Sequence, residues 1–238
     1  MKAPGKFLTA EWKKILMLNY AVDSSLLERF VPAGTELDTF EGKTYLSLVG
    51  FEFNRTRIFK IPVPLHQSFE EVNLRFYVRR STKRGVVFIK ELVPKRAVAA
   101  VARFAFNENY SHTKMSHRIR ICNEMDAVEA EYSWGSGPDR CLISIETAGP
   151  HFIPPVGSES QFITEHYWGY AAQPDGGCLE YEVQHPRWHV RSATKAELSG
   201  STSGLYGTEI ACALLGKPDS AFLAEGSAVT VFKGRRIC

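Results

Sequence analysis

The sequence predicts a mainly β protein of the α+β class, built as a large antiparallel β barrel or bent sheet with a few short helices. Short segments that are apolar, or that alternate apolar and polar residues, recur along the chain and are separated by turn residues. No repeat, low-complexity tract or change of composition marks a linker, and 44% of the residues are hydrophobic, enough for a large core. We therefore expect residues 1–238 to form a single domain.

The first part of the chain is expected to be mostly strands. A strand at 13–22 is followed by a short helix at 24–30, which Asp23 can cap and Pro32 ends. Three further strands are expected at 43–53, 71–79 and 85–93.

Residues 95–107 form the clearest predicted helix. Pro94 suits the first helical position, and apolar side chains recur with helical spacing at Ala97, Val98, Val101, Phe104 and Ala105. Capping-box spacing from Ser158 to Gln161 indicates a helix N-terminus, and another helix is expected at 207–215. The remaining strands are expected at 118–122, 128–134, 140–147, 165–171, 178–183 and 227–232.

Charge and cysteine usage exclude several classes of protein. The 29 Lys and Arg residues against 26 Asp and Glu are too balanced to indicate a nucleic-acid or membrane partner. Five scattered cysteines without a Cys-x-x-Cys pair predict reduced thiols and a cytoplasmic location. The N-terminus lacks the apolar segment of a signal peptide, and the apolar run at 15–18 is too short to span a bilayer. A homo-oligomer is compatible with this composition.

The predicted strand at 71–79 is the most informative segment. Alternate side chains of a strand share a face, so the apolar residues fall on one face and a mostly polar set on the other: Glu71, Asn73, Arg75, Tyr77 and Arg79. This polar face either lies in water, as in a half-buried strand, or lines a barrel wide enough to hold a ligand.

In the second interpretation the strand supplies much of a binding site. Arg75 would hold a substrate carboxylate in bidentate geometry, and Glu71 would transfer a proton. Asn73 and Tyr77 would offer an amide and a hydroxyl. We expect the ligand to be a small molecule that is carboxylated or hydrophobic.

A second candidate wall is the polar and aromatic run at 165–168. Alternation places Glu165 and Tyr167 on one face and His166 and Trp168 on the other. Either pair can line a pocket, and we take Glu165 and Tyr167 as candidate substrate-binding residues. The alternative is a strand that buries its aromatic side chains in the core.

The histidines give a weaker signal. His185 and His189 lie four residues apart, but Pro186 interrupts the helix that a zinc-binding His-Glu-x-x-His motif requires. His166 on a neighbouring strand could approach them, yet single histidines more often serve in packing or hydrogen bonding. No nucleotide-binding glycine motif is present either, so we expect neither a metal nor a cofactor.

Basic residues gather around the predicted hairpin tip at 80–84. They are Arg79, Arg80, Lys83 and Arg84. Such a patch could meet a phosphate backbone, but no aromatic residues interleave with it, which favours a solvated tip.

Lys95 is a candidate nucleophile. It lies in the first turn of the predicted helix, where the helix dipole disfavours an ammonium group, and Arg96 adds like charge. In a desolvated site these effects would free the amine for nucleophilic attack. The alternative is an ordinary solvated surface lysine.

Several motifs resemble the YqjF-like family of uncharacterised proteins. They follow one another in the expected order over most of the chain and include Asn19-Tyr20, Phe69-Glu70-Glu71-Val72-Asn73-Leu74-Arg75, Gly85-Val86-Val87-Phe88, Ile163-Thr164-Glu165-His166-Tyr167 and Val183-Gln184-His185-Pro186-Arg187-Trp188. That family is grouped by fold with acetoacetate decarboxylase, whose core is a large β barrel with a polar interior. The resemblance therefore implies an acetoacetate-decarboxylase-like fold.

The resemblance also implies catalytic residues. The decarboxylase forms a Schiff base between a lysine and a β-keto acid, with a glutamate and an arginine nearby. Its aromatic-x-Glu motif is similar to Phe69-Glu70-Glu71, which implies that Glu71 is the glutamate. Its Glu-Leu and Pro-Lys pairs resemble Glu91-Leu92-Val93-Pro94-Lys95 with a shorter spacing, which implies Lys95 as the nucleophile. The decarboxylase arginine falls near Lys13, so this chain lacks an arginine at that place.

Three functions therefore stand in order. The first is a small-molecule-binding β barrel with an internal polar cavity. The second is a Schiff-base decarboxylase-like enzyme acting on a keto acid, with Lys95 as nucleophile, Glu71 as proton-transfer group and Arg75 as carboxylate ligand. The third is an interaction module that uses the basic hairpin tip.

Overall fold

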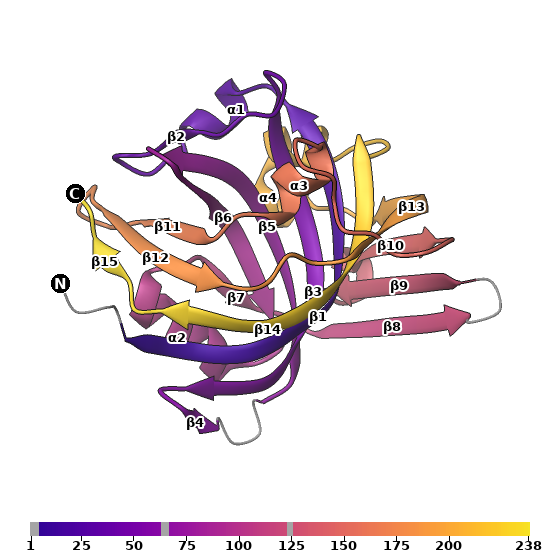
Figure 1. Ribbon diagram of the computed structural model, residues 1–238, viewed down its shortest axis with the longest axis horizontal. Helices are drawn as coiled ribbons and strands as arrows, with labels where there is room; N and C mark the ends of the chain where they lie inside the picture. The colour runs from indigo at the N-terminus through magenta and orange to yellow at the C-terminus, as the bar shows by residue number, and fades with distance from the viewer. Residues whose placement is uncertain (1–4, 63–66, 123–125) are drawn as a thin grey trace.

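The computed structural model describes residues 5–62, 67–122 and 126–238, and within these the side chains of residues 102–104, including the predicted helical residue Phe104, lie outside the description. Most of the chain is strand (Figure 1). The strands are β1 (Lys6–Val22), β2 (Glu36–Leu37), β3 (Thr44–Ile58), β4 (Ile61–Pro62), β5 (Phe69–Arg80), β6 (Lys83–Val93), β7 (Tyr110–His112), β8 (Met115–Cys122), β9 (Ala127–Trp134), β10 (Cys141–Thr147), β11 (Trp168–Ala172), β12 (Cys178–Gln184), β13 (Val190–Ser199), β14 (Ser220–Phe232) and β15 (Arg235–Arg236). The helices are α1 (Ser25–Glu28), α2 (Arg96–Phe106), α3 (Glu159–Thr164), α4 (Ser203–Tyr206) and α5 (Thr208–Ala213), and Gly137–Asp139 forms a 3-10 turn.

Strand pairing closes a ring. Among the described residues, β1 pairs with β3, β3 with β5, β5 with β6, β6 with β11, β11 with β12, β12 with β14, and β14 with β1. All of these pairs are antiparallel except β6 with β11, which meet only at Trp168–Gly85 and Gly169–Val86. Gly169 is required at this seam, because a Cβ there would lie 2.1 Å from the Tyr181 ring.

A second layer covers one side of the ring. Beyond β14 the sheet continues through β13, β10, β9 and β8, and in Figure 1 β8, β9 and β10 project together away from α2. The strands of the ring that face this layer are therefore buried on both faces, which explains why their sequences are apolar at nearly every position.

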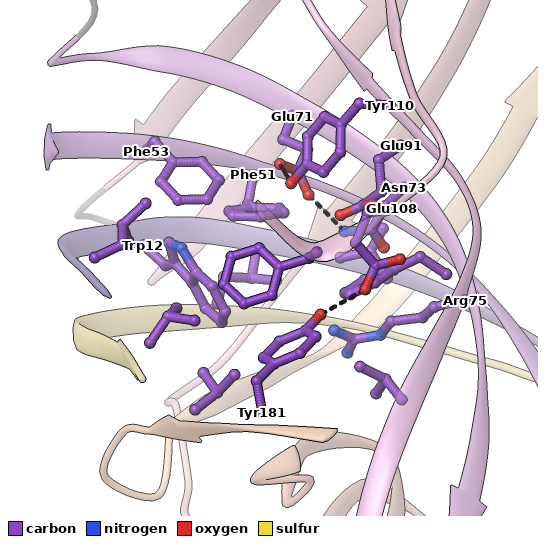
Figure 2. A pocket seen from close by; sticks show the side chains of 18 of the residues that line it. Trp12, Phe51, Phe53, Glu71, Asn73, Arg75, Glu91, Glu108, Tyr110 and Tyr181 are labelled. Atoms are coloured by element: carbon purple, nitrogen blue, oxygen red, sulfur yellow. Dashed lines mark hydrogen bonds between the residues drawn. The ribbon is translucent and has the colours of Figure 1, made fainter. Parts of the chain in front are cut away.

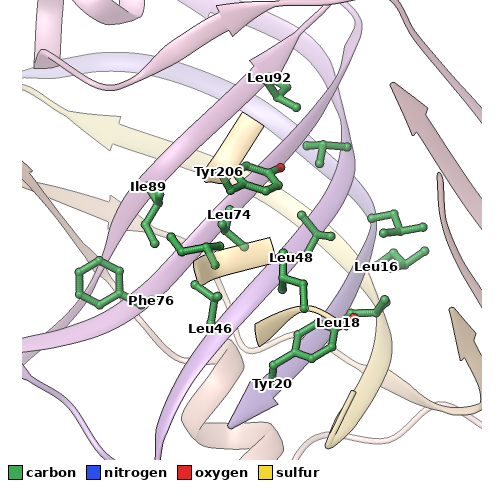
Figure 3. Close-up of a cluster of buried hydrophobic side chains, with 14 of the residues drawn as sticks. Leu16, Leu18, Tyr20, Leu46, Leu48, Leu74, Phe76, Ile89, Leu92 and Tyr206 are labelled. Atoms are coloured by element: carbon green, nitrogen blue, oxygen red, sulfur yellow. The ribbon is translucent and has the colours of Figure 1, made fainter. Parts of the chain in front are cut away.

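Two hydrophobic cores follow from this arrangement. One core lies between the layers and includes Leu16, Leu48 and Leu74 from the ring and Tyr132 and Ile143 from the covering sheet (Figure 3). The other core lies inside the ring, and it takes the alternate residues of the same strands, such as Ile15, Met17, Val49, Phe51 and Tyr77.

The mainly β prediction is confirmed, and most predicted elements are present with shifted ends. The helix predicted at 95–107 begins at Arg96, so Pro94 precedes it rather than occupying its first turn. Ser158 caps α3, because its Oγ accepts from the Gln161 N–H at 3.2 Å. The predicted strand at 165–171 begins only at Trp168, since Glu165 ends α3. The ten-residue strand β13 was not predicted, because its mostly polar sequence lacks a strand pattern.

Gly50 tests the contact between the layers. A Cβ at this position would lie 2.8 Å from the Tyr132 ring and 3.0 Å from the Ile143 side chain. Because neither neighbour has open space to move into, we expect Gly50→Ala to lower the free energy of unfolding by about 1–3 kcal/mol in urea titrations. Gly204→Ala is the control, since its Cβ would have no atom within 4 Å, and it should be neutral or slightly stabilising. Equal stability for Gly50→Ala and the native chain would contradict the packing described.

Candidate functional site

The ring encloses a cavity of about 170 Å³. Every strand of the ring contributes to its wall, and α2 adds Ala97, Val98 and Val101. Most of the wall is aromatic or aliphatic, and Figure 2 shows Trp12, Phe51 and Phe53 on one side, opposite a group of polar side chains. An apolar cavity with a few convergent polar groups is the usual form of a small-molecule site.

The polar side is built across three neighbouring strands. Asn73 of β5 is paired with Glu91 of β6, and Glu91 is paired with Tyr110 of β7. Residues opposite each other in a ladder share a face of the sheet, so these three side chains form a row on the cavity wall. Glu71 lies two residues from Asn73 on the same face of β5, and Glu108 stands just before β7.

A β-bulge decides which residue of β6 enters this row. Leu74 pairs with Lys90 and Arg75 with Phe88, so Ile89 is an extra residue on β6. Strict alternation would place Lys90 on the same face as Phe88. The bulge instead turns Lys90 outward, where its Nζ lies 3.5 Å from Asn109 Oδ1, and turns Glu91 into the cavity.

Hydrogen bonds hold the carboxyl groups in place. Glu71 Oε1 accepts from Asn73 Nδ2 at 3.0 Å, and Glu71 Oε2 accepts from the Tyr110 hydroxyl at 3.0 Å. Glu108 Oε1 accepts from the Tyr181 hydroxyl at 2.8 Å. These bonds are the dashed lines in Figure 2. The two tyrosine hydroxyls are thereby already used as donors.

Burial raises the pKa of all three carboxyl groups. The pKa of Glu71 rises to about 7 because of its burial, against the opposing effect of Asn73, Tyr110 and Arg75. Burial also raises the pKa of Glu108 to about 8. For Glu91, burial and then the neighbouring carboxyls of Glu108 and Glu71 raise the pKa well above its usual range. The site therefore holds exchangeable protons near neutral pH.

Arg75 is the cation of the cavity. Its guanidinium makes no salt bridge with any carboxylate in the described parts of the chain, and its printed neighbours are the Met17 sulfur at 3.8 Å and the Tyr77 ring at 5.9 Å. Its Nε is buried without a hydrogen-bond partner among those residues. A guanidinium in this state can receive an anion in bidentate geometry.

Unpartnered polar atoms gather on the cavity wall. Within the described residues, buried atoms without a hydrogen-bond partner include Trp12 Nε1, Thr56 Oγ1, Asn73 Oδ1, Arg75 Nε, Glu91 Oε2 and both ring nitrogens of His166, and each of these residues lines the cavity. Buried polar groups are almost always hydrogen-bonded in folded proteins. Their concentration here marks the cavity as a place that receives polar groups of another molecule.

The strand at 71–79 largely has the predicted orientation. Glu71, Asn73 and Arg75 line the cavity, whereas Arg79 is exposed and pairs with Glu36 at 3.1 Å. Tyr77 is buried in the inner core but is not among the lining residues described. Its hydroxyl lies 2.7 Å from Ser47 Oγ, and its ring stacks on His166.

The run at 165–168 contributes the other pair. His166 and Trp168 line the cavity, and burial lowers the pKa of His166 to about 4, so its imidazole is neutral. Glu165 instead pairs with Arg187, and Tyr167 packs against His185 with ring centroids 4.8 Å apart. Neither is among the described lining residues. Their role in substrate binding stays a prediction, and the reason for the difference is that Glu165 ends a helix, so strand alternation does not apply to it.

Lys95 is half-buried and directly precedes α2. No lysine is among the described residues that line the cavity. Its role as a nucleophile therefore stays a prediction from the family resemblance, without a contact to Glu71 or Arg75 in the described structure.

Four site residues were missed by the sequence analysis: Glu91, Glu108, Tyr110 and Tyr181. Glu91 could not be chosen over Lys90 without knowledge of the bulge. Glu108 and Tyr110 follow the predicted helix in a segment without a pattern. Tyr181 lies in a strand that was correctly predicted, where alternation with Val183 was the available signal.

The remaining candidates do not form sites. His185 stacks on Trp188 at the cavity, whereas His189 is exposed and packs against His151. No group of three or more His, Cys, Asp or Glu side chains is placed to hold a metal ion in the part of the chain described. The basic side chains of the hairpin tip are each paired with a carboxylate: Arg79 with Glu36, Arg80 and Lys83 with Glu180, and Arg84 with Asp38.

The comparisons with known proteins identify the family. The profile of DUF2071, described as an uncharacterized conserved protein, matches residues 9–228. The chain belongs to the DUF2071 family. A DUF2071 relative, the uncharacterized protein YqjF of Bacillus subtilis (strain 168), is 27% identical over 194 residues, which cover 80% of this chain and 77% of that protein.

Solved structures show that this DUF2071 chain has an acetoacetate-decarboxylase-like fold. An acetoacetate decarboxylase from Legionella pneumophila has a TM-score of 0.69 at 12% identity, covering 99% of this chain and 88% of the other. An acetoacetate decarboxylase-like enzyme from Sphingomonas wittichii RW1 has a TM-score of 0.70 at 10% identity, covering 98% and 93%. The enduracididine biosynthesis enzyme MppR, in complex with pyruvate, has a TM-score of 0.69 at 12% identity, covering 99% and 91%. Among the described residues, no helix has the length and apolar character needed to cross a bilayer.

The raised pKa of Glu108 predicts a pH-dependent stability. The folded chain holds this proton up to about pH 8, whereas the unfolded chain releases it near 4.5. Stability should therefore fall as pH rises between these values, by about 1.4 kcal/mol per pH unit for one group. Glu108→Gln keeps an acceptor for Tyr181 and removes the titration.

We expect Glu108→Gln to gain stability relative to the native chain at pH 8.5 and to match it near pH 4.5 in urea titrations. Glu197→Gln, at an exposed position of β13, should follow the native pH profile. Parallel profiles for Glu108→Gln and the native chain would show that Glu108 is not protonated in the folded state.

Proposed function

We propose that the protein binds a small amphipathic carboxylate inside its barrel. The observation that carries this proposal is the set of unpartnered polar atoms on an otherwise aromatic wall, with Arg75 among them. The ligand's apolar body would pack against Trp12, Phe51 and Phe53, which would remove both surfaces from water. Its carboxylate would pair with the Arg75 guanidinium.

The relatives by fold support a small ligand in this place. One structure with this fold was determined with pyruvate bound, and pyruvate is itself a small carboxylate. The identity to that protein is 12%, so the chemistry is carried by the residues of this chain rather than by the likeness.

Arg75→Met tests the carboxylate contact. It keeps much of the length and apolar stem of the side chain and removes the charge. Hydrogen bonds to charged groups contribute about 1.5–3 kcal/mol, so the affinity for 3-phenylpropionate should fall by about 10- to 100-fold in calorimetric titrations. Arg79→Met lies on the same strand at an exposed position and should bind like the native chain. Undiminished binding by Arg75→Met would exclude Arg75 as the carboxylate ligand.

A second candidate is a lysine-imine enzyme acting on a keto acid. The acetoacetate-decarboxylase-like fold and the position of Glu71 on the cavity wall favour it. Lys95 is its only nucleophile by resemblance, and the described cavity wall contains no lysine. A binding function therefore ranks first.

Borohydride trapping separates the two functions. We expect acetoacetate or pyruvate with sodium borohydride to leave Lys95 unmodified by intact mass and peptide mapping, because its amine does not reach a ligand in the cavity. Lys95→Ala provides the matched control for any adduct. An adduct that maps to Lys95 and disappears in Lys95→Ala would establish the imine chemistry.

A further inference from the structure

Two unpartnered acceptors lie side by side on the cavity wall. Asn73 Oδ1 and Glu91 Oε2 have no hydrogen-bond partner within the described residues, and their residues are 1% and 2% exposed. The two residues are directly paired across β5 and β6, so their side chains project from adjacent points of the same face. Two adjacent acceptors call for a group that carries several donors.

The surroundings of this pair lack donors that could serve it. The Asn73 amide and the Tyr110 hydroxyl donate to Glu71, and the Tyr181 hydroxyl donates to Glu108. Arg75, the one cation on the described wall, lies two residues farther along β5. The cavity therefore has an acidic end and a cationic end about 7 Å apart along one strand.

We infer that the ligand is zwitterionic, an amino acid with an apolar side chain, whose ammonium group binds between Asn73 and Glu91 while its carboxylate binds Arg75. This inference rests on the proposed function, because it adds a second polar contact to the same bound carboxylate. An ammonium group supplies three donors, which suits two acceptors better than the single donor of a hydroxyl group.

Binding of an ammonium group would release a proton. Burial keeps the pKa of Glu91 high in the empty cavity, and an adjacent cation favours the ionised carboxylate. The step is balanced as a protonated Glu91 and an ammonium ligand giving a Glu91 carboxylate paired with the ammonium and one free proton. The charged and titratable groups that line the cavity with Glu91 are Glu71 and Arg75 from β5, Glu108 and Tyr110 at β7, Tyr181 from β12, His166 after α3 and the neighbouring His185.

Three ligands with the same phenyl body test the inference. L-phenylalanine carries an ammonium group, 3-phenyllactate carries a hydroxyl in its place, and 3-phenylpropionate carries neither. We expect phenylalanine to bind at least tenfold more tightly than either acid at pH 8 in calorimetric titrations. Its affinity should rise with pH from 6 to 8, because the proton lost from the site is then more easily released. Titrations in phosphate and Tris buffers should differ in heat by the release of about one proton.

Glu91→Gln tests the residue. It retains the shape of the side chain but cannot ionise, so we expect at least tenfold weaker phenylalanine binding and no proton release. Glu197→Gln should bind phenylalanine like the native chain. The ligand comparison on the native chain decides the matter even where Glu91→Gln does not fold.

The outcomes separate this inference from the proposed function. Equal affinities for phenylalanine and 3-phenyllactate, or no proton release with phenylalanine, would overturn the ammonium site and leave carboxylate binding in place. No binding of any of the three compounds would overturn the proposed function and this inference together.

Discussion

Closure of the ring is the constraint on which the rest of the structure depends. The contact that completes it is short, two residue pairs between β12 and β14, yet it joins strands from the middle and the end of the chain. Once closed, the ring has an interior with no access to bulk solvent through a sheet edge. Side chains of alternating direction then have to satisfy two different environments, the covering sheet outside and the cavity inside.

The acidic groups in that interior carry a cost that the fold tolerates. A buried carboxylate without a partner is strongly disfavoured, and protonation lowers the penalty. Glu71, Glu91 and Glu108 share one wall with a single arginine, so their protons are part of the folded structure. Cores do not need such groups for stability, because apolar side chains would fill the same volume. Their presence points to selection for what the cavity does rather than for how well it folds.

The sequence was sufficient for the fold class and for the strand that carries Glu71, Asn73 and Arg75, because strong alternation in β5 coincides with true faces of a strand. It was insufficient wherever a local irregularity changed the alternation. The bulge at Ile89 exchanged Lys90 for Glu91 on the wall, and the helix end at Glu165 moved the cavity contact to His166 and Trp168. Strand β13 was missed because its stability comes from pairing with β10 and β14 rather than from its own pattern.

The distribution of tryptophans has a practical consequence. Trp12, Trp168 and Trp188 line the cavity, whereas Trp134 is buried in the core between the layers, 1% exposed. The protein thus contains an intrinsic optical reporter: molecules entering the barrel change the surroundings of three indole rings, while the fourth provides an internal reference. Fluorescence emission can therefore follow occupancy of the barrel in the unlabelled native chain, on the timescale of mixing.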